Sequence, residues 1–216
     1  MSDLVDELIE AGRLLAEMGL SPGSSGNVSV RLGNEIWMSA SGTTLGTLER
    51  AAFARVSVDG EPLDPQGPTA TKEAPLHLAM YARNPAATCV VHLHSPNAVA
   101  ASCLAPWRAH SALQPITPYL LMRVGNVPLV PYAAPGDPAQ AAAVRAGALS
   151  FHGALLQNHG SIVSGITVAQ AVDRAIEIEE AARTRLLVGG REDLRPLTDD
   201  EVQELVDRYG QPWGDG

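Results

Sequence analysis

The run from Ala87 to His94 constrains the fold most, because it is almost continuously apolar and ends in two histidines. Its length and content are typical of a strand buried within a sheet. Further short strands are predicted at 28–32, 36–39, 54–58, 127–132, 154–159 and 161–163, with turns at Gly33-Asn34 and Asp59-Gly60.

Helical spacing and capping residues predict helices at 4–18, 71–81, 95–104, 137–149, 167–188 and 198–209. Thr198 and Glu201 form a capping box at the start of the last one. The segment 115–119 is expected to be a proline-rich loop. Strands and helices alternate irregularly, which favours an α/β fold with a mixed, largely antiparallel sheet covered by helices. We find no repeat or linker, so residues 1–216 are expected to form a single domain.

The composition excludes several classes of function. A formal net charge of −9 argues against sequence-independent binding of nucleic acid, which requires many cations. No apolar stretch is long enough to span a membrane. The acidic beginning of the chain and the presence of only two cysteines favour a reducing, cytoplasmic setting. An anionic substrate must then be captured by a local positive or metal-bearing site.

His92 and His94 are two residues apart on the predicted strand, so both imidazoles point to the same face. Two such rings suit a metal with nitrogen ligands, although the pair alone is equally compatible with histidines that share hydrogen bonds. His159 follows another apolar strand and precedes a glycine. Three histidines from two strand ends match a catalytic zinc site with one open position. The other histidines, His77, His110 and His152, are interpreted as structural or exposed.

Glu73 is predicted in the first turn of a helix, where the helix dipole favours its charged form. On its own it would be an ordinary carboxylate at a helix start. Beside a metal it can ligate the ion or serve as an acid or base. Its neighbour Lys72 is the only lysine of the chain, which suggests a position that requires a compact ammonium group. Thr71 and Lys72 could both contact a phosphate or carboxylate.

Two segments rich in glycine and hydroxyl side chains are candidate cradles for an oxyanion. They are Ser24-Ser25-Gly26-Asn27 and the run from Ser39 to Thr44, in which backbone N–H groups can converge on an anion. Such runs are usually plain turns, and their interest lies in their occurrence together with the histidines.

Taken together, these motifs resemble the class II aldolase/adducin family across almost the whole chain, in matching order and with similar spacing: Gly26-Asn27-Val-Ser, Ser41-Gly42, Glu73, His92-x-His94 and Asn158-His159-Gly160. The resemblance implies an αβα sandwich that assembles as a homotetramer with active sites between subunits. It makes His92, His94 and His159 the ligands of one Zn²⁺ per chain, with Glu73 beside the metal. The phosphate pocket would be lined by Gly26, Asn27, Ser41, Gly42 and Thr71.

Longer strings resemble one branch of this family, which decarboxylates 3-oxo-tetronate 4-phosphate. They are Thr71-Lys-Glu-x-Pro-Leu-His77, the segment 116–125 and the segment 128–138. In this branch Tyr119 stands at the place of a tyrosine proton donor that reaches the site of an adjacent subunit; the alternative is a hydrogen-bonded interface tyrosine. Arg123 or Lys72 could hold the substrate anions.

The implied reaction is zinc-dependent loss of CO2 from this phosphorylated four-carbon sugar acid, through a metal-stabilised enediolate, to leave dihydroxyacetone phosphate. The nearest alternative is a class II aldolase acting on a ketose phosphate such as fuculose phosphate, although aldolases carry a Ser-Ser pair where this chain has Thr71-Lys72. A dehydratase or an epimerase of the family is the next, although 4-epimerases generally carry aspartate at the position of Glu73. A binding module similar to adducin, without a metal, is the alternative from another class.

Overall fold

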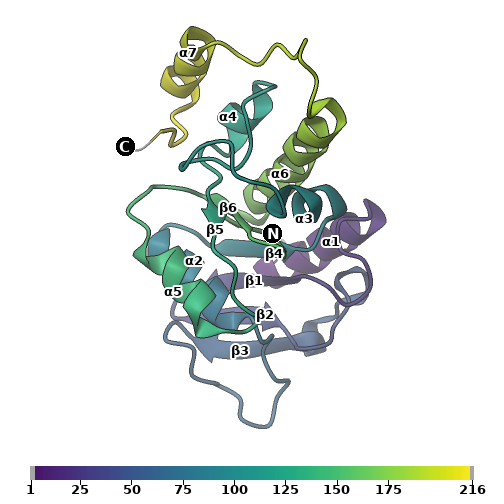
Figure 1. Ribbon diagram of the computed structural model, residues 1–216. Helices are drawn as coiled ribbons and strands as arrows, with labels where there is room; N and C mark the ends of the chain where they lie inside the picture. The colour runs from purple at the N-terminus through teal and green to yellow at the C-terminus, as the bar shows by residue number, and fades with distance from the viewer. Residues whose placement is uncertain (1–2, 215–216) are drawn as a thin grey trace.

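The structure is a computed structural model, which describes residues 3–214. A seven-stranded sheet forms its centre, in the order β3-β2-β1-β4-β7-β6-β5 (Figure 1). Every neighbouring pair is antiparallel except β5 and β6, which are parallel. The predicted mixed, mainly antiparallel sheet is therefore confirmed. The strands are β1 (Asn27–Leu32), β2 (Glu35–Ser39), β3 (Phe53–Ser57), β4 (Cys89–Leu93), β5 (Leu129–Val130), β6 (Gly153–Leu156) and β7 (Gly160–Gly165).

Seven α-helices accompany the sheet in the part of the chain that the structure describes, together with two short 3₁₀ turns, η1 (Leu45–Thr47) and η2 (Arg50–Ala52). Four of the helices have an N-cap side chain that accepts a backbone N–H of the first turn, namely Asp3, Asp137, Thr167 and Thr198. The helices are α1 (Leu4–Glu17), α2 (Ala74–Arg83), α3 (Pro96–Ser102), α4 (Tyr119–Arg123), α5 (Pro138–Ala146), α6 (Val168–Val188) and α7 (Asp199–Tyr209).

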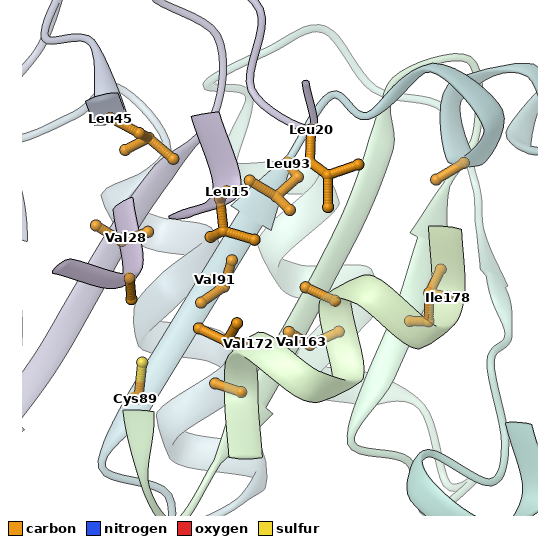
Figure 2. Packing of buried hydrophobic residues seen from close by; sticks show 14 of the residues in the cluster. Leu15, Leu20, Val28, Leu45, Cys89, Val91, Leu93, Val163, Val172 and Ile178 are labelled. Atoms are coloured by element: carbon orange, nitrogen blue, oxygen red, sulfur yellow. The ribbon is translucent and has the colours of Figure 1, made fainter. Parts of the chain in front are cut away.

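The two faces of the sheet bury two separate hydrophobic clusters, which gives the layered αβα arrangement. Helices α1, α3 and α6 cover one face, and α2 and α5 cover the other (Figure 1). The central strand β4 contributes to both clusters, because its side chains alternate between the faces. Val91 and Leu93 pack with Leu15 and Val172 in the first cluster (Figure 2), whereas Val90 belongs to the second. His92 therefore points to the face covered by α2.

Three expectations from the sequence differ from the structure. Helix α2 begins at Ala74, so Glu73 is its N-cap residue and not part of its first turn, and Thr71 and Lys72 precede it. The segment 127–132 contributes only the two residues of β5 as a strand, at the edge of the sheet. The proline-rich loop at 115–119 ends directly in α4, a helix that was not predicted. Its five residues are too few to show helical periodicity in the sequence.

Of the helices in the described residues, none combines the length and apolar content that a membrane span requires.

Candidate active site

Four side chains from three separate parts of the fold converge at the end of β4. His92 lies in β4 and His94 directly after it, His159 lies in the β6–β7 turn, and Glu73 caps α2. Their potential ligand atoms all lie within 4.8 Å of one another. The Nε2 atom of His94 is 2.9 Å from Nε2 of His92 and 3.0 Å from Nε2 of His159. The three imidazoles thus point their Nε2 atoms at one common centre.

Two glycines allow the neighbouring chain segments to approach this strand closely. A Cβ atom at Gly26 would lie 2.8 Å from the carbonyl oxygen of His92, and Gly26 also has a positive φ of 76°. A Cβ atom at Gly160 would lie far inside the contact distance of the Leu93 carbonyl oxygen. These close approaches bring Asn27 on one side and His159 on the other to His92 and His94.

The hydrogen bonds of His92 fix which of its nitrogens can bind a metal. Its Nδ1 lies 2.8 Å from the carbonyl oxygen of Ser161, which can only accept, so Nδ1 carries the proton. In the neutral ring Nε2 is then unprotonated, and its lone pair is directed at the centre of the cluster. This is the tautomer of a histidine that binds a metal through Nε2. His94 Nε2, placed between two other Nε2 atoms, can share a proton with only one of them. A divalent cation would satisfy all three nitrogens, and we conclude that the donor set fits a metal ion.

Electrostatics at the cluster favour a neutral imidazole beside a charged carboxylate. Burial, together with the neighbouring rings of His92 and His159, lowers the pKa of His94 to about 4. Burial alone would raise the pKa of Glu73, but the neighbouring His159 and His92 rings and the hydrogen bond from Asn27 outweigh that effect and hold it well below its usual value. Neutral imidazoles and an ionised carboxylate are the forms that bind metal ions.

A polar cavity of about 310 Å³ opens beside Glu73 and His94. Both glycine- and hydroxyl-rich segments border it. The Ser41 N–H donates to the Thr69 carbonyl and the Thr71 N–H to the Ser39 carbonyl, which holds the second segment against the residues that precede α2. The lining brings together most of the predicted substrate-binding residues: Gly26, Asn27, Ser41, Gly42, Thr71 and Lys72, with Ser24, Ser25, Ala40, Thr43 and Pro135.

Tyr119 and Arg123 lie on α4, outside this lining. The Tyr119 side chain is 52% exposed. Arg123 lies near the buried carboxyl of Glu177, whose pKa burial raises to about 7 while the arginine charge opposes that rise. Within one chain the structure therefore separates these two residues from the four-residue cluster.

His77 contacts the site through Asn27, so of the two interpretations from the sequence, structural or exposed, the structure excludes exposure. It is completely buried, and its Nε2 lies 2.6 Å from the side-chain oxygen of Asn27, whose amide in turn donates to Glu73 at 2.7 Å. The available signal was spacing: Glu73 and His77 are four residues apart, as neighbours on one helix face are. His110, in contrast, packs between Trp107 and Trp213, away from the cluster.

Comparisons with known proteins agree with this geometry. The family model of the class II aldolase and adducin N-terminal domain matches residues 6–186. The 3-oxo-tetronate 4-phosphate decarboxylase of Haemophilus influenzae is 38% identical over 96% of this chain and 99% of its own length. The crystal structure of YgbL from Klebsiella pneumoniae is similar, with a TM-score of 0.88 and 39% identity over 94% of this chain and 97% of that one. The L-fuculose phosphate aldolase of Escherichia coli is 27% identical over 95% of this chain and 94% of its own. The resemblance seen in the sequence is confirmed, and the chain belongs to the class II aldolase and adducin family.

Proposed function

We propose that the protein is a zinc-dependent carboxy-lyase that converts 3-oxo-tetronate 4-phosphate into dihydroxyacetone phosphate and CO2. The observation that carries the proposal is the convergence of three histidine Nε2 atoms and the Glu73 carboxylate at the mouth of a polar cavity. Identity of 38% with a decarboxylase of this substrate, over nearly the full length of both chains, supports the choice of reaction.

The metal would be held by His92, His94 and His159, with Glu73 beside it. Three neutral nitrogen ligands and an open position are the usual set for catalytic zinc. When bound, the ion supplies a Lewis acid that stabilises negative charge developing on a substrate oxygen.

The substrate anions would be bound by residues that line the cavity. Because the chain carries a net charge of −9, its overall field repels a phosphorylated acid, and local groups must compensate. Lys72, the only lysine, lines the cavity together with hydroxyl groups of Ser24, Ser41 and Thr71. We propose that these groups and nearby backbone N–H groups bind the phosphate. We also propose that Lys72, or Arg123 of a neighbouring subunit, holds a substrate anion without binding the departing carboxylate tightly.

The reaction breaks the bond between C1 and C2 of the substrate. The electron pair moves from the carboxylate carbon toward the neighbouring C3 carbonyl, CO2 leaves, and C2 must then gain one proton. Departure of CO2 needs no base, so an acid is required only afterwards. Glu73, buried beside the histidines, is one candidate to deliver this proton. Tyr119 is the other, and we propose that it acts in the site of a neighbouring subunit of a homotetramer.

The position of Tyr119 within its own chain supports a role in the site of a neighbouring subunit. Tyr119 is half exposed at the start of α4, outside the cavity lining of its own chain, so a neighbouring subunit is where its hydroxyl could reach a substrate. We also propose a cytoplasmic setting, where the phosphorylated substrates of such enzymes are found.

Decarboxylation and aldol cleavage can be told apart directly. Both could release dihydroxyacetone phosphate from a suitable substrate, but only decarboxylation releases CO2. The test is incubation of the zinc-loaded protein with 3-oxo-tetronate 4-phosphate and, in parallel, with fuculose and ribulose 1-phosphates. CO2 from the oxo acid, with slow cleavage of the ketose phosphates, supports the proposal. Efficient ketose cleavage without CO2 would assign the protein to the aldolases, as the 27% identity with fuculose phosphate aldolase would then suggest.

A further inference from the structure

A buried chain of hydrogen bonds leads away from Glu73 into the interface between the sheet and α2. The Asn27 Nδ2 donates to Glu73 Oε2 at 2.7 Å, and Asn27 Oδ1 lies 2.6 Å from His77 Nε2. On the other side of the ring, His77 Nδ1 lies 2.8 Å from Ser29 Oγ, which is 2.9 Å from the Tyr81 hydroxyl. All five side chains are buried.

The sequence explains why these residues meet. Asn27 and Ser29 are two apart on β1 and point to the same face of the sheet. Glu73, His77 and Tyr81 are spaced by four and follow one face of α2 from its N-cap. The polar face of the strand therefore packs against the polar stripe of the helix, in an interface that is otherwise apolar.

The hydrogen bonds from Glu73 to Tyr81 allow a single consistent arrangement of protons, which the Glu73 carboxylate determines. Glu73 Oε2 can only accept, so Asn27 presents its NH₂ group to Glu73 and its oxygen to His77. His77 Nε2 must then carry a proton. Because burial lowers the pKa of His77 to about 3, the ring is neutral and Nδ1 accepts from the Ser29 hydroxyl. Ser29 in turn accepts from Tyr81, and every proton points toward Glu73.

This arrangement treats the two carboxylate oxygens of Glu73 differently. Oε2 accepts from Asn27 and lies 3.1 Å from His92 Nε2, whereas Oε1 is buried, has no hydrogen-bond partner and lies 3.0 Å from His159 Nε2. If the Asn27 amide flipped, its oxygen would face Oε2 at hydrogen-bond distance, which is repulsive. The flip would also turn the NH₂ group of Asn27 toward the proton on His77 Nε2, so both neighbours oppose it.

We propose that His77 is a positioning residue: it locks the Asn27 amide so that Asn27 holds Oε2 of Glu73 and leaves Oε1, without a hydrogen-bond donor, directed at His159. The catalytic part of this inference rests on the proposed function, in which Glu73 serves as an acid or base. The structural part, the tautomer of His77 and the orientation of Asn27, does not.

The structural part is tested on the native, zinc-loaded protein by NMR with isotope-labelled histidine. The expected result is a protected imidazole N–H on Nε2 of His77, assigned by its loss in His77→Gln, and a ring that stays neutral between about pH 5 and 8. A proton on Nδ1, or a positively charged ring in this range, would overturn the inference. This measurement requires no substrate, so it remains decisive if the proposed reaction is wrong.

The catalytic part is tested with three variants of similar burial. His77→Leu removes the donor and should lower kcat by about 100-fold, within the range of one acid or base group, with retained zinc and KM changed less than about 3-fold. His77→Gln keeps a donor near the Nε2 position and should recover most of the loss. Tyr81→Phe breaks only the far end of the chain and should stay within about 2-fold of the native kcat.

Equal losses in His77→Leu and Tyr81→Phe would indicate a packing role and overturn the inference, as would native turnover in His77→Leu. Failure of the proposed function has a different signature. The native enzyme would then release no CO2 from the oxo acid, and the three variants would be compared on the family substrate that the native enzyme does convert.

Discussion

The Nδ1 atom of His92 donates its proton to the carbonyl oxygen of Ser161, 2.8 Å away on the neighbouring strand. A hydrogen bond of the central sheet thereby sets the chemistry of the site, because it leaves Nε2 of His92 as a lone pair among the Nε2 atoms of His94 and His159. The metal site is consequently built into the sheet, and its integrity depends on the register between β4 and β7.

Zinc binding should depend on His92 and His94. Replacing His92 or His94 with Ala should reduce zinc from about one ion per chain to a trace and abolish turnover, since two ligands bind far more weakly than three. Elemental analysis of the purified protein measures this directly. His152→Gln, which changes a histidine outside the cluster, should keep the metal. Full activity in metal-free protein would contradict the account.

Gly160 should be intolerant of any side chain. A Cβ atom there would clash with the backbone of Leu93, at the point where the His159 turn meets the histidine strand. We expect Gly160→Ala to lower the free energy of unfolding by more than about 2 kcal/mol and to weaken zinc binding. Thermal unfolding with and without zinc gives both quantities. Gly147→Ala is the matched control, because Gly147 has a φ of −59° and the nearest atom to its Cβ would be 3.5 Å away. Equal stability of the two variants would refute the close-approach argument.

Lys72 should contribute to substrate binding or turnover. It lines the cavity next to Glu73. Lys72→Met should lower kcat/KM by a factor that corresponds to about 2–3 kcal/mol of lost transition-state stabilisation, the scale of a lost charge-assisted contact. Steady-state kinetics with the oxo acid provide the measurement. Lys72→Arg keeps the charge but not the compact ammonium, so it should recover only part of the loss. Native kinetics in Lys72→Met would make Lys72 an ordinary exposed residue.

The sequence predicted the parts of the site that depend on periodicity. Alternation along β4 correctly placed His92 and the opposite-facing Val91 and Leu93, and the three histidines do converge. Glu73 was expected in a helical turn, but it is the cap, because the helix begins one residue later.

The side-chain contacts of Asn27 could not be predicted from the periodicity of the sequence. Glu73 and His77 are 46 and 50 residues away along the chain, so their contacts with Asn27 depend on how α2 docks on the sheet. Periodicity within one segment gives the face of a residue, not the segment that covers it. The short helix α4 was missed for a related reason, since it contains little more than one turn.

A shared site between subunits leads to a complementation prediction. Tyr119→Phe removes only the hydroxyl, so assembly should survive while turnover falls by about 10²–10⁴-fold, as for loss of a proton donor. Glu73→Gln should be inactive as well. If Tyr119 acts in a neighbouring subunit, mixing the two inactive proteins should restore part of the activity in hybrid sites. Mixed oligomers that are demonstrably formed but remain inactive would count against a shared site.

The most direct test of the central claim is the product ratio from 3-oxo-tetronate 4-phosphate labelled in its carboxyl group. The account predicts that the zinc-loaded protein releases one labelled CO2 for each dihydroxyacetone phosphate. It also predicts that chelation stops both products, that added zinc restores them, and that His94→Ala yields neither. Dihydroxyacetone phosphate without labelled CO2, or equal rates in the zinc-loaded protein and in His94→Ala, would contradict a metal-dependent decarboxylase.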